Sequence, residues 1–226
     1  MRRSGLLWMA VAAIVFGGCS KTEGGKPEPA SVGTGGAGAD VKSDGEFVHD
    51  IALKNMTAVE LSRMARDKAT SPGIKAFAER MIDEHGAAGD KLKSIVSGHS
   101  VEWPAQLDDK HRKTADELAR KQGPDFDSDY VKSMVEGQQD LAAKLESRLD
   151  VQSLADWKTA AAGRAESKTM PEPTVELRDV AVRPNKSDSE ITMKINQWAA
   201  DTYPMAQKQL DTARALANAT KKRSTN

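Results

Sequence analysis

The stretch Ser71–Ser97, SPGIKAFAERMIDEHGAAGDKLKSIVS, determines the class of fold expected for this chain. Ser71 is a residue type that caps helix N-termini, and Pro72 suits the first helical turn, where no N–H is needed. Apolar side chains then recur every three or four residues, as on one face of an amphipathic helix. The sequence therefore predicts a helix from Pro72 to about Ser97. Its buried face contains Ile74, Phe77, Ala78, Met81, Ile82, His85, Leu92 and Ile95.

The same periodicity predicts three more long helices and one short helix. The long helices are expected at 46–68, 126–149 and 189–219, and a short, highly charged helix at 107–122. Along the first of them, His49, Leu53, Met56, Glu60 and Met64 share one face. The region from Glu46 onward is rich in residues that favour helices. We therefore expect an all-α fold, a four-helix bundle with an extra short helix.

Residues 154–187, before the last long helix, fit this pattern least well. The segment begins as an Ala-rich helical stretch through Glu166, and Met170-Pro171-Glu172-Pro173 then interrupts it. Beyond the prolines, Val175 and Leu177 alternate with polar residues, as in a short strand. A lone strand has no partner in an all-helical domain. We therefore expect an irregular insertion that lies on the bundle.

The first 19 residues have the features of an export signal. Arg2 and Arg3 supply a positive start, and Leu6–Phe16 form an apolar run of 11 residues. Such a run is too short to span a bilayer, which takes about 20 apolar residues, and is typical of a signal-peptide core. Phe16-Gly17-Gly18-Cys19 resembles the lipobox of bacterial lipoproteins, which implies that Cys19 is diacylated and becomes the mature N-terminus. The alternative is an ordinary signal peptide with an incidental cysteine.

The lone cysteine favours the lipoprotein interpretation. Cys19 is the only cysteine in the chain, so no internal disulfide can form. Two acyl chains would anchor the protein stably to a membrane, where one would bind only reversibly. Ser20 stands where Asp would favour retention in the inner membrane. We therefore expect a protein on the periplasmic side of the envelope, lipid-anchored through Cys19 in the outer membrane.

Composition separates a tether from the bundle and excludes one class of partner. Residues 20–45 contain seven glycines and two prolines and no aromatic side chain, which predicts a flexible tether. The bundle domain is expected at 46–219 and a basic tail at 220–226. Removing residues 1–18 takes away two arginines and no acids, so 33 bases against 33 acids become 31 against 33, a charge of −2. Without a basic excess, nucleic acid is not expected as a partner.

Several short motifs, in their order and spacing, resemble one bacterial family. They are Phe47, Asn55-Met56 and Val59-Glu60-Leu61, then Ile74 to Ala78, Met81-Ile82 and Glu84-His85, then Phe126-Asp127, Tyr130 and Met134-Val135, and finally Tyr203-Pro204 and Gln209-Leu210. This pattern is similar to that of the domain of unknown function 4142 family. The resemblance implies an exported, ferritin-like four-helix bundle, often with a lipoprotein leader, whose biochemical role is not established.

The resemblance also implies a metal site to consider. Ferritin-like bundles can hold a metal pair in the core through Glu and Glu-x-x-His ligands. The family places Glu in the first helix, Asp-His in the second and third, and His in the fourth. This chain keeps Glu60 and Glu84-His85, but Gln138 and Gln209 replace two of the expected histidines. Because glutamine is a poor ligand for transition metals, an iron or zinc site here would be degenerate.

The same positions have a second interpretation that needs no metal. Glu60, His85, Gln138 and Gln209 each lie near the middle of an apolar helical face, so in a bundle they would meet as one buried layer. Buried polar groups must find partners or cost about 1 to 3 kcal/mol each. We expect a hydrogen-bonded layer that fixes the helix register. The alternatives are a weak metal site that includes Glu84, or positions that do not meet.

Sequence motifs for catalysis are missing. No thiol follows Cys19, and the chain has no Gly-x-Ser-x-Gly, no phosphate-binding Gly-rich loop and no His-Glu-x-x-His. We therefore expect a non-enzymatic binding or structural module, without a cofactor, that contacts a partner protein in the envelope. The alternative is a metal-binding protein that handles iron or acts in redox chemistry.

Overall fold

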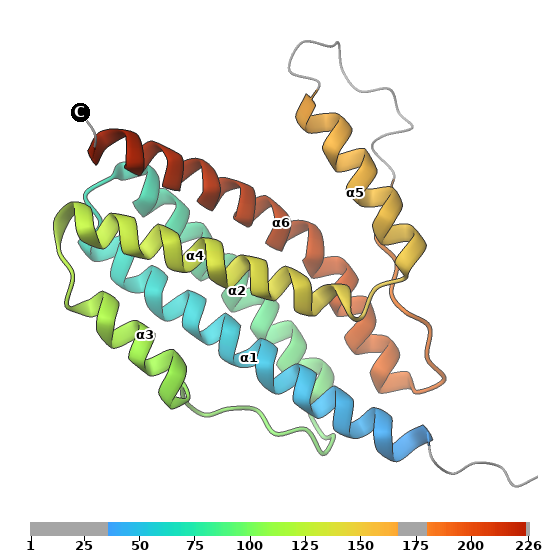
Figure 1. The fold of residues 1–226 in the computed structure, drawn as a ribbon. Coiled ribbons are helices and arrows are strands. Elements are labelled where there is room, and N and C mark those ends of the chain that lie inside the picture. The colour runs from blue at the N-terminus through green and yellow to red at the C-terminus, as the bar shows by residue number, and fades with distance from the viewer. Residues whose placement is uncertain (1–35, 167–179, 225–226) are drawn as a thin grey trace, which may run out of the picture. The chain divides into compact units, whose positions relative to one another are not determined.

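The computed structural model describes residues 36–166 and 180–224, which belong to one unit, Thr34–Asn226. Within these residues the regular elements are all helices, joined by loops, and the β-pairing consists of one isolated bridge between Leu149 and Pro184. The expected all-α fold is thus confirmed. The helices are α1 (Gly36–Lys68), α2 (Pro72–Val96), α3 (Asp109–Ala119), α4 (Gly123–Glu146), α5 (Val151–Glu166) and α6 (Glu190–Ser224) (Figure 1). None of these helices is both long and apolar enough to cross a membrane.

The four long helices form a bundle in the order α1, α2, α6, α4, in which each helix contacts the next and α4 contacts α1. The short helix α3 packs against α1 and α4 (Figure 1). The core consists of two apolar clusters. One contains Phe47, Leu145, Trp198 and Tyr203, and the other contains Phe77, Phe126 and Tyr130.

A polar residue separates the two clusters in each long helix. In α1, Asn55 lies between Ile51 of the first cluster and Ala58 of the second. The corresponding polar residues of the other helices are His85 in α2, Gln138 in α4 and Gln209 in α6, and all four side chains are buried. We call these four residues the central polar layer.

The helix α1 begins at Gly36, ten residues before the predicted start at Glu46. Asp44 explains part of this difference, because its carboxylate is buried and pairs with the Arg148 guanidinium. Thr192 donates a hydrogen bond of 2.6 Å to the other oxygen of Asp44. The predicted tether is therefore wrong for residues 36–45, because composition does not reveal a partner 104 residues away. Residues 20–35 of the predicted tether lie outside the described residues.

The connection between α1 and α2 depends on a residue from α4. The Asp127 carboxylate accepts hydrogen bonds from the backbone N–H of Thr70 at 2.9 Å, from the Thr70 hydroxyl at 2.5 Å and from the backbone N–H of Ser71 at 3.1 Å. Ser71 occupies the N-cap position of α2 as predicted, but its side chain makes no capping bond. The turn is instead held by the charged side chain of Asp127.

The end of the predicted insertion is tied to the end of α4. Asp150 N–H donates to the Arg183 carbonyl, and Asn185 N–H donates to the Arg148 carbonyl, both at 2.9 Å. Most of the strand-like stretch at 174–182 lies outside the described residues. The basic tail expected at 220–226 is helical as far as Ser224, because α6 continues through it.

Candidate functional site

The central polar layer is organised around His85. The ring is buried, and its Nδ1 atom lies 2.8 Å from Oδ1 of Asn55. Its Nε2 atom lies 3.0 Å from Oε1 of Gln209 and 2.9 Å from Nε2 of Gln138. The imidazole therefore contacts one amide side chain from each of the other three long helices.

Glu84, the neighbour of His85 on α2, orients one of these amides. Its carboxylate accepts a hydrogen bond of 2.6 Å from Nε2 of Gln209. Because a carboxylate only accepts, the amide nitrogen of Gln209 must face Glu84, and its oxygen must face the His85 ring. Of the predicted site residues, Glu84, His85, Gln138 and Gln209 are thus joined in one network.

Burial lowers the pKa of His85 to about 4, with the hydrogen bond to Gln209 acting in the opposite direction. The ring is therefore neutral at pH 7 and carries one proton. We assign the proton to Nδ1, which then donates to Asn55 while Nε2 accepts from Gln138. The oxygen of Gln209 then faces Nε2 with no proton between them. One neutral ring therefore cannot form hydrogen bonds with all three amide side chains.

Two buried amide atoms of the layer have no hydrogen-bond partner among the described residues. They are Nδ2 of Asn55 and Oε1 of Gln138. A buried polar atom left without a partner costs about 1 to 3 kcal/mol. The layer is therefore not fully satisfied by its own members.

Glu60 does not join this network, contrary to the prediction. It lies half-buried on the side of α1 that faces α3, and no hydrogen bond or ion pair is found for it within the described parts of the chain. The helix instead directs Asn55 into the layer. Besides buried large side chains such as Ile51 and Leu61, the buried part of α1 includes a row of small or polar residues. This row contains Ala52, Asn55, Ala58, Ser62 and Ala65.

The donor set does not fit an iron or zinc pair. Within the described ranges, no three His, Cys, Asp or Glu side chains converge as metal ligands do. Both ring nitrogens of His85 face amides, and Glu84 reaches the ring only through Gln209. Transition metals prefer imidazole, thiolate or carboxylate ligands over neutral amides.

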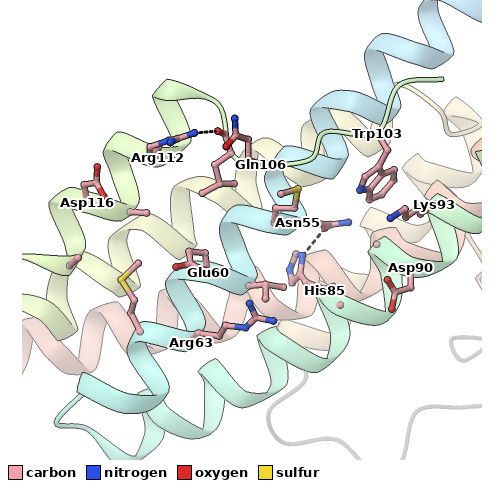
Figure 2. Close-up of a pocket in the computed structure, with 18 residues that line it drawn as sticks. Asn55, Glu60, Arg63, His85, Asp90, Lys93, Trp103, Gln106, Arg112 and Asp116 are labelled. Atoms are coloured by element: carbon pink, nitrogen blue, oxygen red, sulfur yellow. Dashed lines mark hydrogen bonds between the residues drawn. The ribbon is translucent and has the colours of Figure 1, made fainter.

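A cavity of about 700 Å³ opens beside the layer, between α1, α2, α3 and the segment that precedes α3. Asn55 and His85 lie at its inner wall (Figure 2). Apolar lining comes from Met56, Met64 and Trp103, among others. Six charged residues also line it, namely Glu60, Arg63, Asp90, Lys93, Arg112 and Asp116. The volume falls within the range of about 300 to 1,000 Å³ that is common for ligand sites.

Two glycines of α2 line this cavity and add no side chain to its wall. A Cβ atom at Gly86 would meet nothing within 4 Å, and one at Gly89 would lie 3.7 Å from Nδ2 of Asn55, an ordinary contact. Helix packing therefore does not require glycine at either position. A glycine in a helix interior costs about 1 kcal/mol relative to alanine. What the two glycines provide is open space beside the central polar layer.

A second, smaller cavity of about 150 Å³ is also lined by His85. Its lining includes Gln138 and Gly137 of α4. Each residue that carries an unpartnered amide atom, Asn55 or Gln138, thus borders a cavity.

Asn55 was not predicted as a site residue, although the sequence contains a signal for it. It follows Ile51 by four residues and precedes Ala58 by three, so it falls on a regular helical face. Leu53, Met56 and Met64 lie on a neighbouring face. A rule that expects small residues where two helices pack closely would have identified the face with Asn55 as buried.

The fold and the central polar layer define a helical-bundle protein with a buried amide and imidazole network and an adjoining open cavity. The chain matches the domain of unknown function 4142 (DUF4142) over residues 30–168, and it belongs to this family. The matched residues include the whole of α1 to α5 and end before α6, so Gln209 lies beyond them. No curated protein and no solved structure matches the chain.

Proposed function

We propose that this protein is a lipid-anchored envelope protein whose bundle is a non-enzymatic binding module, with the cavity beside Asn55 and His85 as its binding site. The observation that supports the proposal is the state of His85. The ring is buried, neutral and surrounded by amides, while a cavity of about 700 Å³ lies next to it. Both ring nitrogens of this histidine face amide side chains, whereas the adjoining cavity can hold a ligand.

The proposed location rests on the leader sequence. Leu6–Phe16 provides a signal-peptide core, and Phe16-Gly17-Gly18-Cys19 provides the acylation site. The membrane partner is reached through lipidated Cys19, with the bundle on the periplasmic side, in the outer membrane of a cell that has two membranes. A protein of the envelope is the proposed macromolecular partner.

Lipidation is tested by expressing the full precursor in a bacterial host that is fed an alkyne-labelled fatty acid. We expect the precursor to be labelled at Cys19 and processed, and Cys19→Ala to lose the label and accumulate as uncleaved or mislocalised precursor. Ser20→Ala is the matched control and should be labelled normally. Normal cleavage and membrane retention of an unlabelled Cys19→Ala protein would contradict the lipid anchor.

The metal-binding alternative is tested by calorimetric titration of the mature chain carrying Cys19→Ser with Fe²⁺ and Zn²⁺. We expect no stoichiometric binding, because the layer offers one imidazole and several neutral amides. The double variant Gln138→His with Gln209→His supplies two further imidazoles and should gain affinity sharply. Tight binding by the native chain that His85→Ala abolishes would replace the binding-module proposal with a metal site.

A further inference from the structure

Building on the proposed function, we infer that the cavity between α1, α2 and α3 binds a short peptide that carries both a positive and a negative charge, with Asn55 donating to a peptide carbonyl oxygen. Three features of the cavity lead to this ligand class: an unpartnered buried donor, lining charges of both signs, and two glycines in the part of the wall that α2 forms.

The unpartnered donor is Nδ2 of Asn55. The side chain is 4% exposed, and its Oδ1 atom is held by the His85 ring, so the amide nitrogen has a fixed direction. Figure 2 shows it directed toward the end of the cavity that holds Trp103 and Lys93. A donor of this kind requires an oxygen acceptor, and a peptide carbonyl supplies one. The interaction would remove the cost of a buried donor without a partner.

The lining charges complement a ligand that has charges of both signs. Glu60, Asp90 and Asp116 are acidic, and Arg63, Lys93 and Arg112 are basic. Among the described residues, none of these six side chains forms an ion pair. A phosphate-rich ligand would need a basic excess, and a fatty acid carries no positive charge to pair with Glu60, Asp90 and Asp116. A mixed-charge peptide instead pairs with lining residues of both signs.

The apolar part of the lining suits variable side chains. Met56 and Met64 have flexible, polarizable side chains that adapt to ligands of different shape. Trp103 lies beneath the Lys93 ammonium group, with 5.9 Å between the nitrogen and the ring centroid. These residues can bury small apolar side chains of a peptide without demanding one sequence.

The glycines of α2 let a peptide backbone come close to Asn55. Gly86 and Gly89 are separated by about one helical turn and line the same cavity. Close approach of a backbone to a ligand is a common use of glycine. A bulky side chain at Gly86 would enter the open space, since nothing lies within 4 Å of its Cβ position.

The experiment uses the mature chain with Cys19→Ser and tetrapeptides that contain Lys, Leu, Glu and Ala in every order. Binding is followed by saturation-transfer NMR and quantified by calorimetry. We expect binding by the native chain, at least tenfold weaker binding by Gly86→Leu, and unchanged binding by Gly163→Leu. Gly163 is a matched control because it is also helical, with no atom within 4 Å of its Cβ position, and lies outside the cavity.

Two further variants test the contacts one by one. Asn55→Leu removes the donor and should weaken binding about fivefold, the value expected for one lost hydrogen bond of about 1 kcal/mol. Glu60→Lys reverses one charge on a half-buried position. It should weaken binding of these tetrapeptides relative to a second set in which Glu replaces Lys. The charge reversal keeps the test valid if Gly86→Leu fails to fold, which circular dichroism would detect.

Palmitate and glucose serve as probes of other chemical classes. Binding of palmitate or glucose that depends on Gly86, with no peptide binding, would overturn the peptide inference and leave the binding module intact. Peptide binding that none of the cavity variants changes would also overturn the inference. If no probe of any class binds in a way that depends on Gly86, both the inference and the proposed binding function are wrong.

Discussion

At the scale of single residues, His85 shows what a sequence pattern can and cannot reveal. His85, Gln138 and Gln209 were predicted together because each interrupts an apolar helical face. Their hydrogen-bond geometry and the participation of Asn55 were not predicted, because these depend on how four helices rotate against one another. Glu60 was placed in the layer because it lies near the middle of the apolar stripe with Leu53, Met56 and Met64.

The buried histidine makes stability depend on pH. The pKa of His85 is about 4 in the folded chain, whereas an unfolded histidine has its ordinary value of 6.5. The unfolded state therefore binds more protons between these values, and the free energy of unfolding falls as pH decreases through that window. The loss attributable to His85 should reach about 3 kcal/mol near pH 4.

Urea denaturation of the native chain and of His85→Met between pH 4 and pH 7 measures this effect. The two proteins share their carboxylates, so the difference between their pH profiles isolates His85. The same substitution at the exposed residue His99 is the control and should keep the native profile. Parallel profiles for the native chain and His85→Met would show that His85 is not buried as a neutral ring.

At the scale of secondary-structure elements, the helices were predictable and the contacts that join their ends were not. The bounds of α2 and the existence of α4 and α6 follow from a period of three to four residues. Asp127 is different, because nothing near it in the sequence identifies Thr70 and Ser71 as its partners. Side chains that fix a turn from another helix become visible only in three dimensions.

The Asp127 contact leads to a second stability prediction. Asp127→Asn keeps the size of the side chain but replaces one accepting oxygen with a donor that faces other donors. Hydrogen bonds to charged groups contribute about 1.5 to 3 kcal/mol, so we expect a loss of about 2 to 3 kcal/mol in the free energy of unfolding. Chemical denaturation at pH 7 measures it.

The exposed neighbour Asp125 provides the control for Asp127. It lies in the first turn of α4, so Asp125→Asn removes a charge near the same helix N-terminus without touching the α1–α2 turn. The dipole effect alone should cost less than about 1 kcal/mol. Equal losses for the two variants would mean that the turn does not depend on Asp127.

At the scale of the whole molecule, one buried carboxylate joins the first helix to the end of α4 and to the last helix. Asp44 of α1 pairs with Arg148, which follows α4, and accepts a hydrogen bond from Thr192 of α6. The Arg148 guanidinium also lies 4.4 Å from the centroid of the Phe47 ring. The bundle therefore includes residues that composition alone assigns to a tether.

This contact predicts where the folded unit begins. A chain that starts at Gly36 retains Asp44, whereas one that starts at Glu46 leaves the buried Arg148 without its anion. Removing one partner of a buried ion pair costs about 3 to 5 kcal/mol. We expect that loss, measured by urea denaturation, for the chain starting at Glu46 and for Asp44→Ala in the longer chain. Equal stability of the two truncated chains would place the ion pair outside the cooperative fold.

The same ion pair has a mechanical consequence for a protein held at its N-terminus. If the chain is anchored at Cys19, any pull on the bundle enters through the start of α1. Asp44 lies eight residues after Gly36, where α1 is joined to both Arg148 and Thr192. A pulling force would therefore be distributed over α1, α4 and α6 at that end of the bundle. The helix α1 would not separate from the other helices alone. Asn55, which lines the cavity and lies eleven residues after Asp44, would then experience little of this force.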